Sequence, residues 1–370
     1  MGSVTGGSLK VSIFGESHGK AIGAVIDGLP SGIAIDMELI REQMTRRAPG
    51  GDKVWSTKRK EADVPEIISG VWNGMTTGTP LCALIANTDT KSSDYSEFTR
   101  TPRPGHADLT AILRYSGYSD PRGGGHFSGR LTAAMVFAGA VCNQVIKKRH
   151  PVSIYSRICS IGDITDFSDA ENISDTEQKR LVLSDFPVID RKAGEDMIDL
   201  IRDAAGEADS VGGVIETIIK GFPFGIGDPI FEGMESRIAA LVFSVPAVKG
   251  VEFGSGFAGT KLRGSVNNDG FCYCGQGNGN EIKDIRTCSN NAGGILGGIT
   301  TGMPIVLRTA VKPTASVGRQ QNSIDLETAE SKVLKIKGRH DPCIVPRAVP
   351  VIEAVCCIAL LDSLLHSEGL

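Results

Sequence analysis

The chain has 370 residues, and 41% hydrophobic with 22% charged residues is an ordinary composition for a folded, water-soluble protein. Its formal net charge of -4 gives no overall attraction to nucleic acid or to an anionic membrane. No run of 18 apolar residues occurs, and the first ten residues lack the features of a secretory or transit peptide. Nine cysteines without a C-x-x-C pair indicate reduced thiols. The sequence therefore predicts a cytoplasmic protein with no nucleic-acid or membrane partner.

The first predicted element is a strand over Leu9 to Phe14, and the motif "GESHG" that follows it satisfies the G-x-S-x-G pattern of a hydrolase nucleophile elbow. An elbow needs a helix after the serine. The residues from Ala21 to Leu29 instead contain two glycines and several β-branched side chains, which favour a second strand. Ser17 and His18 are therefore predicted on the loop of a hairpin, and a serine hydrolase that uses Ser17 is the weaker alternative.

Helical spacing of apolar residues predicts further elements along the chain. A helix is expected over Met37 to Arg47 and another over Pro229 to Val245. Two long apolar helices are expected where Arg130 opens "RLTAAMVFAGAVCNQVI" and where Arg347 opens "RAVPVIEAVCCIALLDSLL". A more polar stretch that includes "FSDAENISDTEQKR" lies between the two groups, and residues 267–284, with "GQGNGN", are expected to form a mobile Gly/Asn-rich loop.

A repeat relates the two parts of the chain. The segment "NGMTTGTPL" (73–81) returns as "GGITTGMPI" (297–305), and each copy precedes a strand-like run. Self-similarity of this kind is typical of duplicated supersecondary units. We therefore expect a single domain over residues 1–370, built from two related halves at about 9–145 and 210–365. The alternative is that unrelated strand-turn-strand units share the same turn chemistry.

Glycine, arginine and histidine are concentrated in a few loops, although the protein as a whole is acidic. Glycines let backbone N–H groups approach a ligand, and guanidinium groups bind phosphate and carboxylate through two points. These loops together predict a site for a polyanion. A metal site is not expected: Cys272 and Cys274 are closely spaced, but no second pair or histidine near them in the sequence completes a tetrahedral set. The loops are "RRAPGGDK", "RTPRPGHADLT", "YSDPRGGGHFSGR", "NNAGGILGGITTG", "VKPTASVGRQ" and "KIKGRHDPCIVPR".

The motifs "FGESHG", "RPGHAD", "RGGG…S-x-R", "NNAGGILGGI", "KPTAS" and "GRHDPCIVPRAVP" occur in this order, and with them the chain resembles chorismate synthase from Ser12 to about Leu364. The resemblance implies an α+β fold, a β-α-β sandwich with an internal pseudo-twofold repeat, assembled as a homotetramer. It implies an enzyme of aromatic amino acid biosynthesis. Such an enzyme removes phosphate and a ring proton from 5-enolpyruvylshikimate 3-phosphate to give chorismate, in an anti-1,4-elimination that uses reduced FMN without net redox change.

The resemblance also implies roles for individual residues. His18 is the acid near the departing phosphate, His106 is the proton partner of reduced FMN, and Asp341 with Ser17 as a relay serves the flavin N5. The implied substrate-binding residues are Arg47, Lys53, Arg103, Arg130 and Arg339. The implied FMN-binding residues are His126, Phe127, Ser128, Ala247, Gly297, Lys312, Pro313, Thr314, Ala315, Ser316 and Arg339.

The chain departs from the family pattern at three places. His126-Phe127 stands where Arg-Ser is common, Pro246 begins a stretch that often starts with asparagine, and Lys53 replaces a frequent arginine. No separate G-x-G-x-x-G unit is visible between a strand and a helix. We therefore expect NADPH to act only indirectly, through a separate flavin reductase. The alternative from another class is a phospholigand-binding protein without catalysis.

Overall fold

The computed structural model describes residues 2–51, 53–56, 63–88, 97–273, 285–336 and 340–369. Its first sheet is antiparallel throughout and contains five strands. Alternating buried side chains such as Ile22, Ala24 and Ile26 turn one face of this sheet to the core. In spatial order the strands are β1 (Val4–Thr5), β2 (Lys10–Gly15), β3 (Ala21–Asp27), β7 (Leu81–Ala86) and β4 (Pro65–Ser69).

The second sheet is also antiparallel and has five strands. Ile215 and Ile219 of its central strand are fully buried and contribute to the same core as the first sheet. In spatial order the strands are β9 (Ile164–Thr165), β8 (Ser153–Ile161), β10 (Gly213–Lys220), β16 (Ile305–Val311) and β11 (Val248–Phe253).

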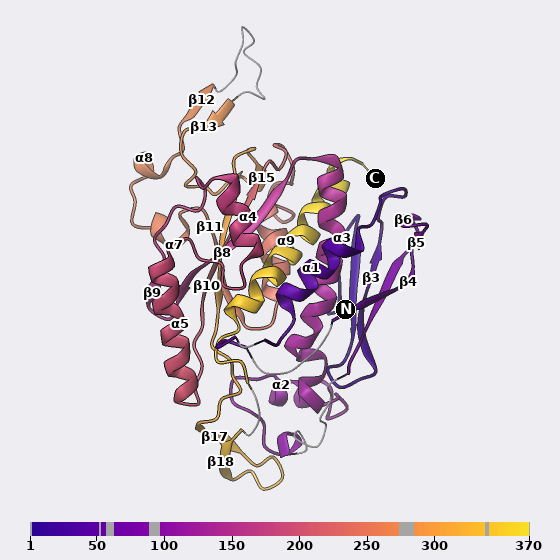
Figure 1. Cartoon of the computed structure of the whole chain (residues 1–370), viewed down its shortest axis with the longest axis vertical. Coiled ribbons are helices and arrows are strands. Elements are labelled where there is room, and N and C mark those ends of the chain that lie inside the picture. Colours follow the sequence, from indigo (N-terminus) through magenta and orange to yellow (C-terminus); the bar gives the residue numbers. More distant parts are fainter. Residues whose placement is uncertain are drawn as a thin grey trace.

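Helices fill the space between the two sheets (Figure 1). The central pair is α3 (Thr132–Arg149) and α9 (Val345–Ser367), which pack on each other, with α1 (Met37–Arg47) and α6 (Met234–Ser244) beside them. A β-carbon on Gly139 would lie 2.4 Å from Ala354 Cα, so this glycine sets how closely α3 and α9 approach. Both long helices are apolar enough to cross a membrane, but 78% and 94% of their most apolar windows are buried inside the protein. They are therefore core helices.

Four strands of each sheet follow one another in the same spatial order and the same chain order: β2, β3, β7 and β4 correspond to β8, β10, β16 and β11, and α1 and α3 correspond to α6 and α9. The edge strands differ, because β1 precedes β2 in the chain whereas β9 follows β8. This correspondence supports the predicted pair of related halves, which stays a prediction. The second sheet begins at Ser153, within the stretch that the sequence suggested was a polar connection, because β8 is buried along most of its length.

Helix α4 (Asp175–Leu183) covers the face of the second sheet that points away from the main core, where Leu181 packs against Tyr155, Ile218 and Val306. The remaining elements lie mainly at the ends and edges of the sandwich (Figure 1). Residues 274–284 of the predicted mobile loop lie outside the described residues, and 271–273 before them form a strand. The helices among them are α2 (Asp108–Arg114), α5 (Arg191–Gly206), α7 (Gly256–Gly259) and α8 (Gly264–Asn267), with 3-10 turns at Arg122–Phe127 and Gly129–Leu131. The short strands pair as β5 (Val71–Trp72) with β6 (Met75–Thr76), β12 (Phe271–Tyr273) with β13 (Ile285–Thr287), β14 (Ile295–Leu296) with β15 (Ile299–Thr300), and β17 (Gln320–Ile324) with β18 (Ser331–Lys335).

Candidate active site

The loop between β2 and β3 carries Ser17 and His18, as predicted, because these two strands form an antiparallel hairpin. No helix follows the serine, so the geometry of a nucleophile elbow is not present. Both side chains are buried, with exposed fractions of 7% and 6%. The Ser17 amide donates to the Gly125 carbonyl at 3.1 Å, which joins this loop to the triple-glycine turn at 123–125.

The side chains of both predicted proton-transfer histidines, His18 and His106, pack against the backbone of the triple-glycine turn. Gly123 and Gly124 have φ angles of 63° and 84°, a region that favours glycine. A β-carbon on Gly123 would lie 2.5 Å from the His18 ring and 2.7 Å from Ser17 Oγ, and one on Gly124 would lie 2.9 Å from the His106 ring. The absence of side chains at two consecutive positions therefore lets two imidazoles from distant loops come close to one backbone turn.

His106 belongs to a cluster at the start of α2. Its Nδ1 lies 2.7 Å from Asp108 Oδ1, and Arg103 grips the same carboxylate through Nε at 2.7 Å and Nη2 at 2.8 Å. Burial opposes ionisation of Asp108, but the hydrogen bonds from Arg103 and His106 outweigh it and hold the pKa of this carboxyl well below its usual range. Asp108 is therefore an ionised group that links a predicted substrate-binding arginine to a predicted catalytic histidine.

The "KPTAS" loop packs against this cluster from the second half of the chain. Arg103 Nη1 lies 3.3 Å from Ser316 Oγ, and Lys312 Nζ donates to the Gly105 carbonyl. Burial lowers the pKa of Lys312, and the neighbouring Lys249 adds to this effect. The buried Thr314 hydroxyl has no hydrogen-bond partner among the residues that the structure describes. The loop therefore brings a cation and a free hydroxyl to the edge of the site.

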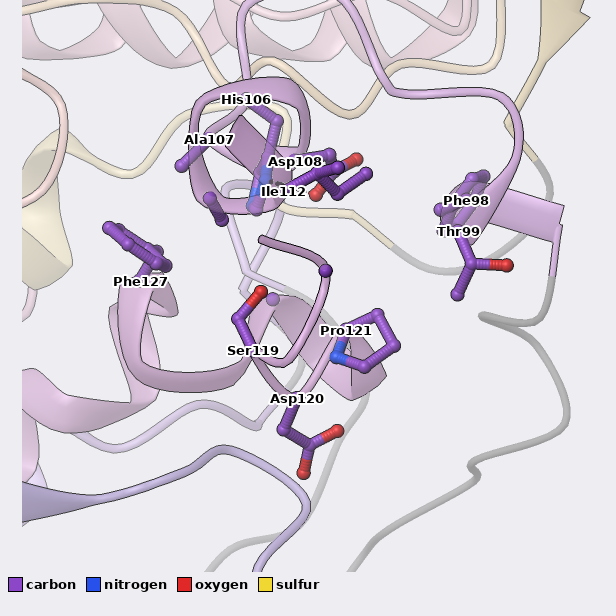
Figure 2. A pocket seen from close by; sticks show the side chains of 13 residues that line it. Phe98, Thr99, His106, Ala107, Asp108, Ile112, Ser119, Asp120, Pro121 and Phe127 are labelled. Atoms are coloured by element: carbon purple, nitrogen blue, oxygen red, sulfur yellow. Dashed lines mark ion pairs between the residues drawn. The ribbon is translucent and has the colours of Figure 1, made fainter. Parts of the chain in front are cut away.

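A pocket of about 140 Å³ opens beside His106 (Figure 2). Figure 2 shows His106 and Asp108 on one side, with Ser119 and Pro121 facing them. Most of the remaining wall is apolar, so the pocket combines a hydrophobic slot with one imidazole and the two carboxylates of Asp108 and Asp120. The lining residues are Phe98, Thr99, His106, Ala107, Asp108, Ala111, Ile112, Gly117, Ser119, Asp120, Pro121, Gly124 and Phe127.

Arg47 and Arg130 share one carboxylate. Arg47 Nη1 lies 2.6 Å from Asp63 Oδ2, Arg130 Nη1 contacts Asp63 Oδ1, and none of the Asp63 side chain is exposed. Burial lowers the pKa of Arg47 to about 10, with a further contribution from Arg347, while Asp63 opposes the shift. The trio carries a net charge of +1. The other guanidinium nitrogens bond to Thr132 Oγ1, Gly129 O, Asn87 Oδ1 and Ala86 O.

Asp341 lies at the start of α9 and is buried, with 8% of its surface exposed. Its Oδ2 accepts a hydrogen bond from Arg347 Nη1, and Arg347 Nε donates to the Arg47 carbonyl at 3.1 Å. Asp341 is thereby connected to the Arg47 cluster through a single side chain. Arg339, predicted to contact both substrate and cofactor, lies outside the described residues.

Other predicted residues are held by protein groups. Lys53 Nζ lies 2.6 Å from Asp185 Oδ1, in the loop after α4. Both ring nitrogens of His126 are engaged, Nε2 with Ser3 Oγ at 2.8 Å and Nδ1 with the Gly15 carbonyl at 2.9 Å. Phe127 lines the pocket, whereas Ser128 caps the next turn by accepting from the Arg130 amide at 3.3 Å. Phe127 therefore lies at the pocket, whereas the His126 ring connects its turn to Ser3 and Gly15.

Two predicted FMN-binding residues lie in the second half. The Ala247 carbonyl accepts from the Lys312 amide at 2.9 Å, which places Ala247 beside the "KPTAS" loop. Gly297 is in the turn between β14 and β15, and Figure 1 shows β15 at the end of the molecule opposite α2. Within one chain, Gly297 is therefore apart from the pocket.

The chain is similar to known proteins over nearly its whole length. The family model for chorismate synthase matches residues 9–365. The chain belongs to the chorismate synthase family. A chorismate synthase of Dehalococcoides mccartyi is 44% identical over 367 residues, covering 99% of this chain and 98% of the relative. One from Methanococcus maripaludis is 43% identical, covering 98% and 97%. A crystal structure of chorismate synthase matches with a TM-score of 0.75 at 28% identity, over 99% of this chain and 94% of that chain.

Membership of the chorismate synthase family makes the chain an enzyme, a lyase of the shikimate pathway, and the predicted α+β fold of this family is confirmed. Two residues that shape the site were not assigned from the sequence. Asp108 could have been found from the sequence, because it is an acidic residue two positions after His106, at the start of a helix. Asp63, within the charged run "KRKEADVPE", resembled an ordinary solvated segment.

Proposed function

We propose that the enzyme converts 5-enolpyruvylshikimate 3-phosphate to chorismate by anti-1,4-elimination of phosphate and a ring proton, with reduced FMN as cofactor. One observation supports the proposal in addition to family membership. The side chains of His18 and His106 pack against two consecutive glycines, beside an arginine cluster and a hydrophobic pocket. An elimination of phosphate needs anion binding and proton transfer in one place, and these residue types supply both. No described feature favours the hydrolase or the binding-protein alternative.

The pocket residues suit a flavin. Phe98, Ile112 and Phe127 provide apolar walls for a planar ring, and the free Thr314 hydroxyl and the Lys312 ammonium offer a donor and a cation for its polar and phosphate groups. When bound, reduced FMN supplies transient electron density that helps phosphate leave and recovers it when the ring proton is lost. Ala247 and Ser316 lie close enough to the Lys312 loop to support this role, and Gly297 stays a prediction.

The chain's own residues then bind the substrate and manage protons. Arg47, Arg103 and Arg130 would hold the phosphate and carboxylates and stabilise charge on the leaving group. His18 would protonate the departing phosphate, and His106 would exchange a proton with reduced FMN. The Asp341 carboxylate, with Ser17 as relay, would collect the ring proton. Lys53 would have to release Asp185 to join the anion cluster.

The test is an anaerobic assay with chemically reduced FMN and 5-enolpyruvylshikimate 3-phosphate. We expect chorismate and phosphate in equal amounts, with no consumption of reductant, and no turnover with oxidised FMN. Substrate binding without product would favour a phospholigand-binding protein. Labelling of Ser17 by a fluorophosphonate would favour a hydrolase. A second assay supplies NADPH but no flavin reductase. It tests whether the enzyme depends on a separate source of reduced flavin, as expected.

Replacing Asp341 with asparagine is expected to lower the turnover rate by about 10²-fold or more without unfolding the protein. Asparagine keeps an oxygen that accepts from Arg347, but it does not take a proton. Single-turnover absorbance under anaerobic conditions should show a flavin complex that decays slowly. A variant with near wild-type turnover would limit Asp341 to its turn and its contact with Arg347.

We also propose the homotetramer that the family resemblance implied, in the cytoplasm. Several large apolar side chains of the second half lie exposed on a single chain, among them Phe231 at 86%, Phe257 at 77% and Phe271 at 72%. Large apolar side chains that are exposed on a single chain are candidates for burial against another subunit. Sedimentation equilibrium should give four times the mass of one 39.0 kDa chain. An active monomer would contradict the proposal.

A further inference from the structure

The imidazole of His106 is held between one hydrogen-bond acceptor and one donor. Nδ1 lies 2.7 Å from Asp108 Oδ1 and 3.1 Å from Arg103 Nη2. A guanidinium only donates and an ionised carboxylate only accepts, so these two contacts demand opposite states of Nδ1. Arg103 Nη2 already donates to Asp108 Oδ1 at 2.8 Å. The shorter, charge-assisted contact to the carboxylate therefore decides that Nδ1 carries the proton.

Asp108 is fixed in the orientation that this contact needs. Its Oδ2 accepts from Arg103 Nε at 2.7 Å and from the Arg103 amide at 3.0 Å, and only 9% of its side chain is exposed. Arg103 is in turn held by Ser316 and lies 4.7 Å above the Phe98 ring. Arg103 is therefore anchored by several contacts, and it holds both oxygens of the carboxylate in the orientation that reaches His106.

The other ring nitrogen points to the place where chemistry is expected. A β-carbon on Gly124 would lie 3.1 Å from His106 Nε2, and both residues line the pocket. With the proton on Nδ1, a neutral ring keeps a lone pair on Nε2. Arg103 Nη2 lies 3.4 Å from Nε2, so a bound group would replace or share this contact as the donor to the lone pair. This is the arrangement in which a carboxylate sets the tautomer of a catalytic histidine and stabilises its protonated form.

We propose that Asp108 is a positioning residue, which keeps the proton of His106 on Nδ1 and presents Nε2 to the pocket as the atom that accepts and returns a proton. This inference rests on the proposed role of His106. It also explains why Arg103 and His106 share one carboxylate: the ionic grip of the arginine holds Asp108 in place, and Asp108 orients the histidine.

The decisive variant is Asp108→Asn. We expect the amide oxygen to take the Oδ2 position, where it accepts from both Nε and the backbone amide of Arg103, and the amide nitrogen then takes the Oδ1 position and faces His106 Nδ1. Nδ1 must accept from that nitrogen, so the proton moves to Nε2. Solid-state ¹⁵N NMR of histidine-labelled enzyme without flavin or substrate, at alkaline pH where an imidazole is neutral, separates the two tautomers. The chain has six histidines, and the His106 signals are those missing from His106→Ala.

We expect the wild-type spectrum to show protonated Nδ1 and Asp108→Asn to show protonated Nε2. We also expect kcat to fall by about 10²-fold or more, with a small change in KM, since loss of the correct tautomer removes proton transfer rather than binding. Asp325→Asn is the matched control, because it removes a buried carboxylate that pairs with Arg100 and contacts no histidine. It should keep both the wild-type tautomer and most of kcat.

The two readouts separate this inference from the proposed function. A wild-type His106 protonated on Nε2, or an unchanged tautomer in Asp108→Asn, would overturn the positioning role whatever the activity. A switched tautomer with undiminished kcat would uphold Asp108 as the tautomer-setting group and remove His106 Nε2 from the reaction. If Asp108→Asn does not fold, the wild-type spectrum alone still decides which nitrogen carries the proton.

Discussion

Replacing His106 with alanine is expected to lower the turnover rate by about 10²-fold or more, while the fold and most of the substrate affinity are retained. The imidazole lies on Gly124 at the edge of the pocket and has only 20% of its side chain exposed, so its loss removes the proton-exchanging group without disturbing the apolar core. The measurement is anaerobic single-turnover kinetics with reduced FMN, alongside circular dichroism.

His366→Ala provides the comparison for this variant. His366 lies at the end of α9, has 52% of its side chain exposed and faces Asp228 at 3.5 Å. It should turn over at the wild-type rate. An unchanged rate in His106→Ala would remove this histidine from the mechanism. An equal loss in both variants would point to a general effect on folding or assembly.

Replacing Asp63 with alanine is expected to destabilise the protein by about 3–5 kcal/mol, because it removes the buried carboxylate that two buried guanidinium groups contact. The side chains of Arg47 and Arg130 are only 4% and 5% exposed, so water cannot take the place of the carboxylate. Asp63→Asn should cost less, since its amide oxygen still accepts one hydrogen bond. Urea unfolding monitored by circular dichroism gives the free energy of unfolding for each variant.

Asp196→Ala is the control for the Asp63 variants. Asp196 pairs with Lys192 on the surface of α5 at 2.7 Å, with side-chain exposures of 44% and 74%, and exposed pairs contribute less than about 1 kcal/mol. If Asp63→Ala were as stable as Asp196→Ala, the two arginines would have found other partners. The buried cluster would then be an incidental contact.

Several helices of the fold could be predicted from the spacing of apolar residues along the chain. The helix expected over 37–47 is α1, and the two long apolar segments are α3 and α9. The helix expected over 229–245 begins later, at Met234, and Gly233 is its N-cap. Pro229 and Gly233, which precede Met234, are poor residues for the interior of a helix. The stretch read as a polar connection contains β8, since Ser156 and Arg157 are buried polar residues whose side chains bond to Thr217 and Glu216 on the neighbouring strand.

The sequence by itself determined the family, the hairpin that carries Ser17 and His18, and the set of basic and glycine-rich loops. Motif order and local patterning are properties of the chain, so they needed no coordinates. Only the tertiary structure decided that Gly123 and Gly124 carry the two histidines, that Asp63 joins Arg47 to Arg130, and that Asp108 orients His106. Those contacts are made across turns and between halves, where side-chain orientation and burial, rather than spacing along the chain, determine which charges meet.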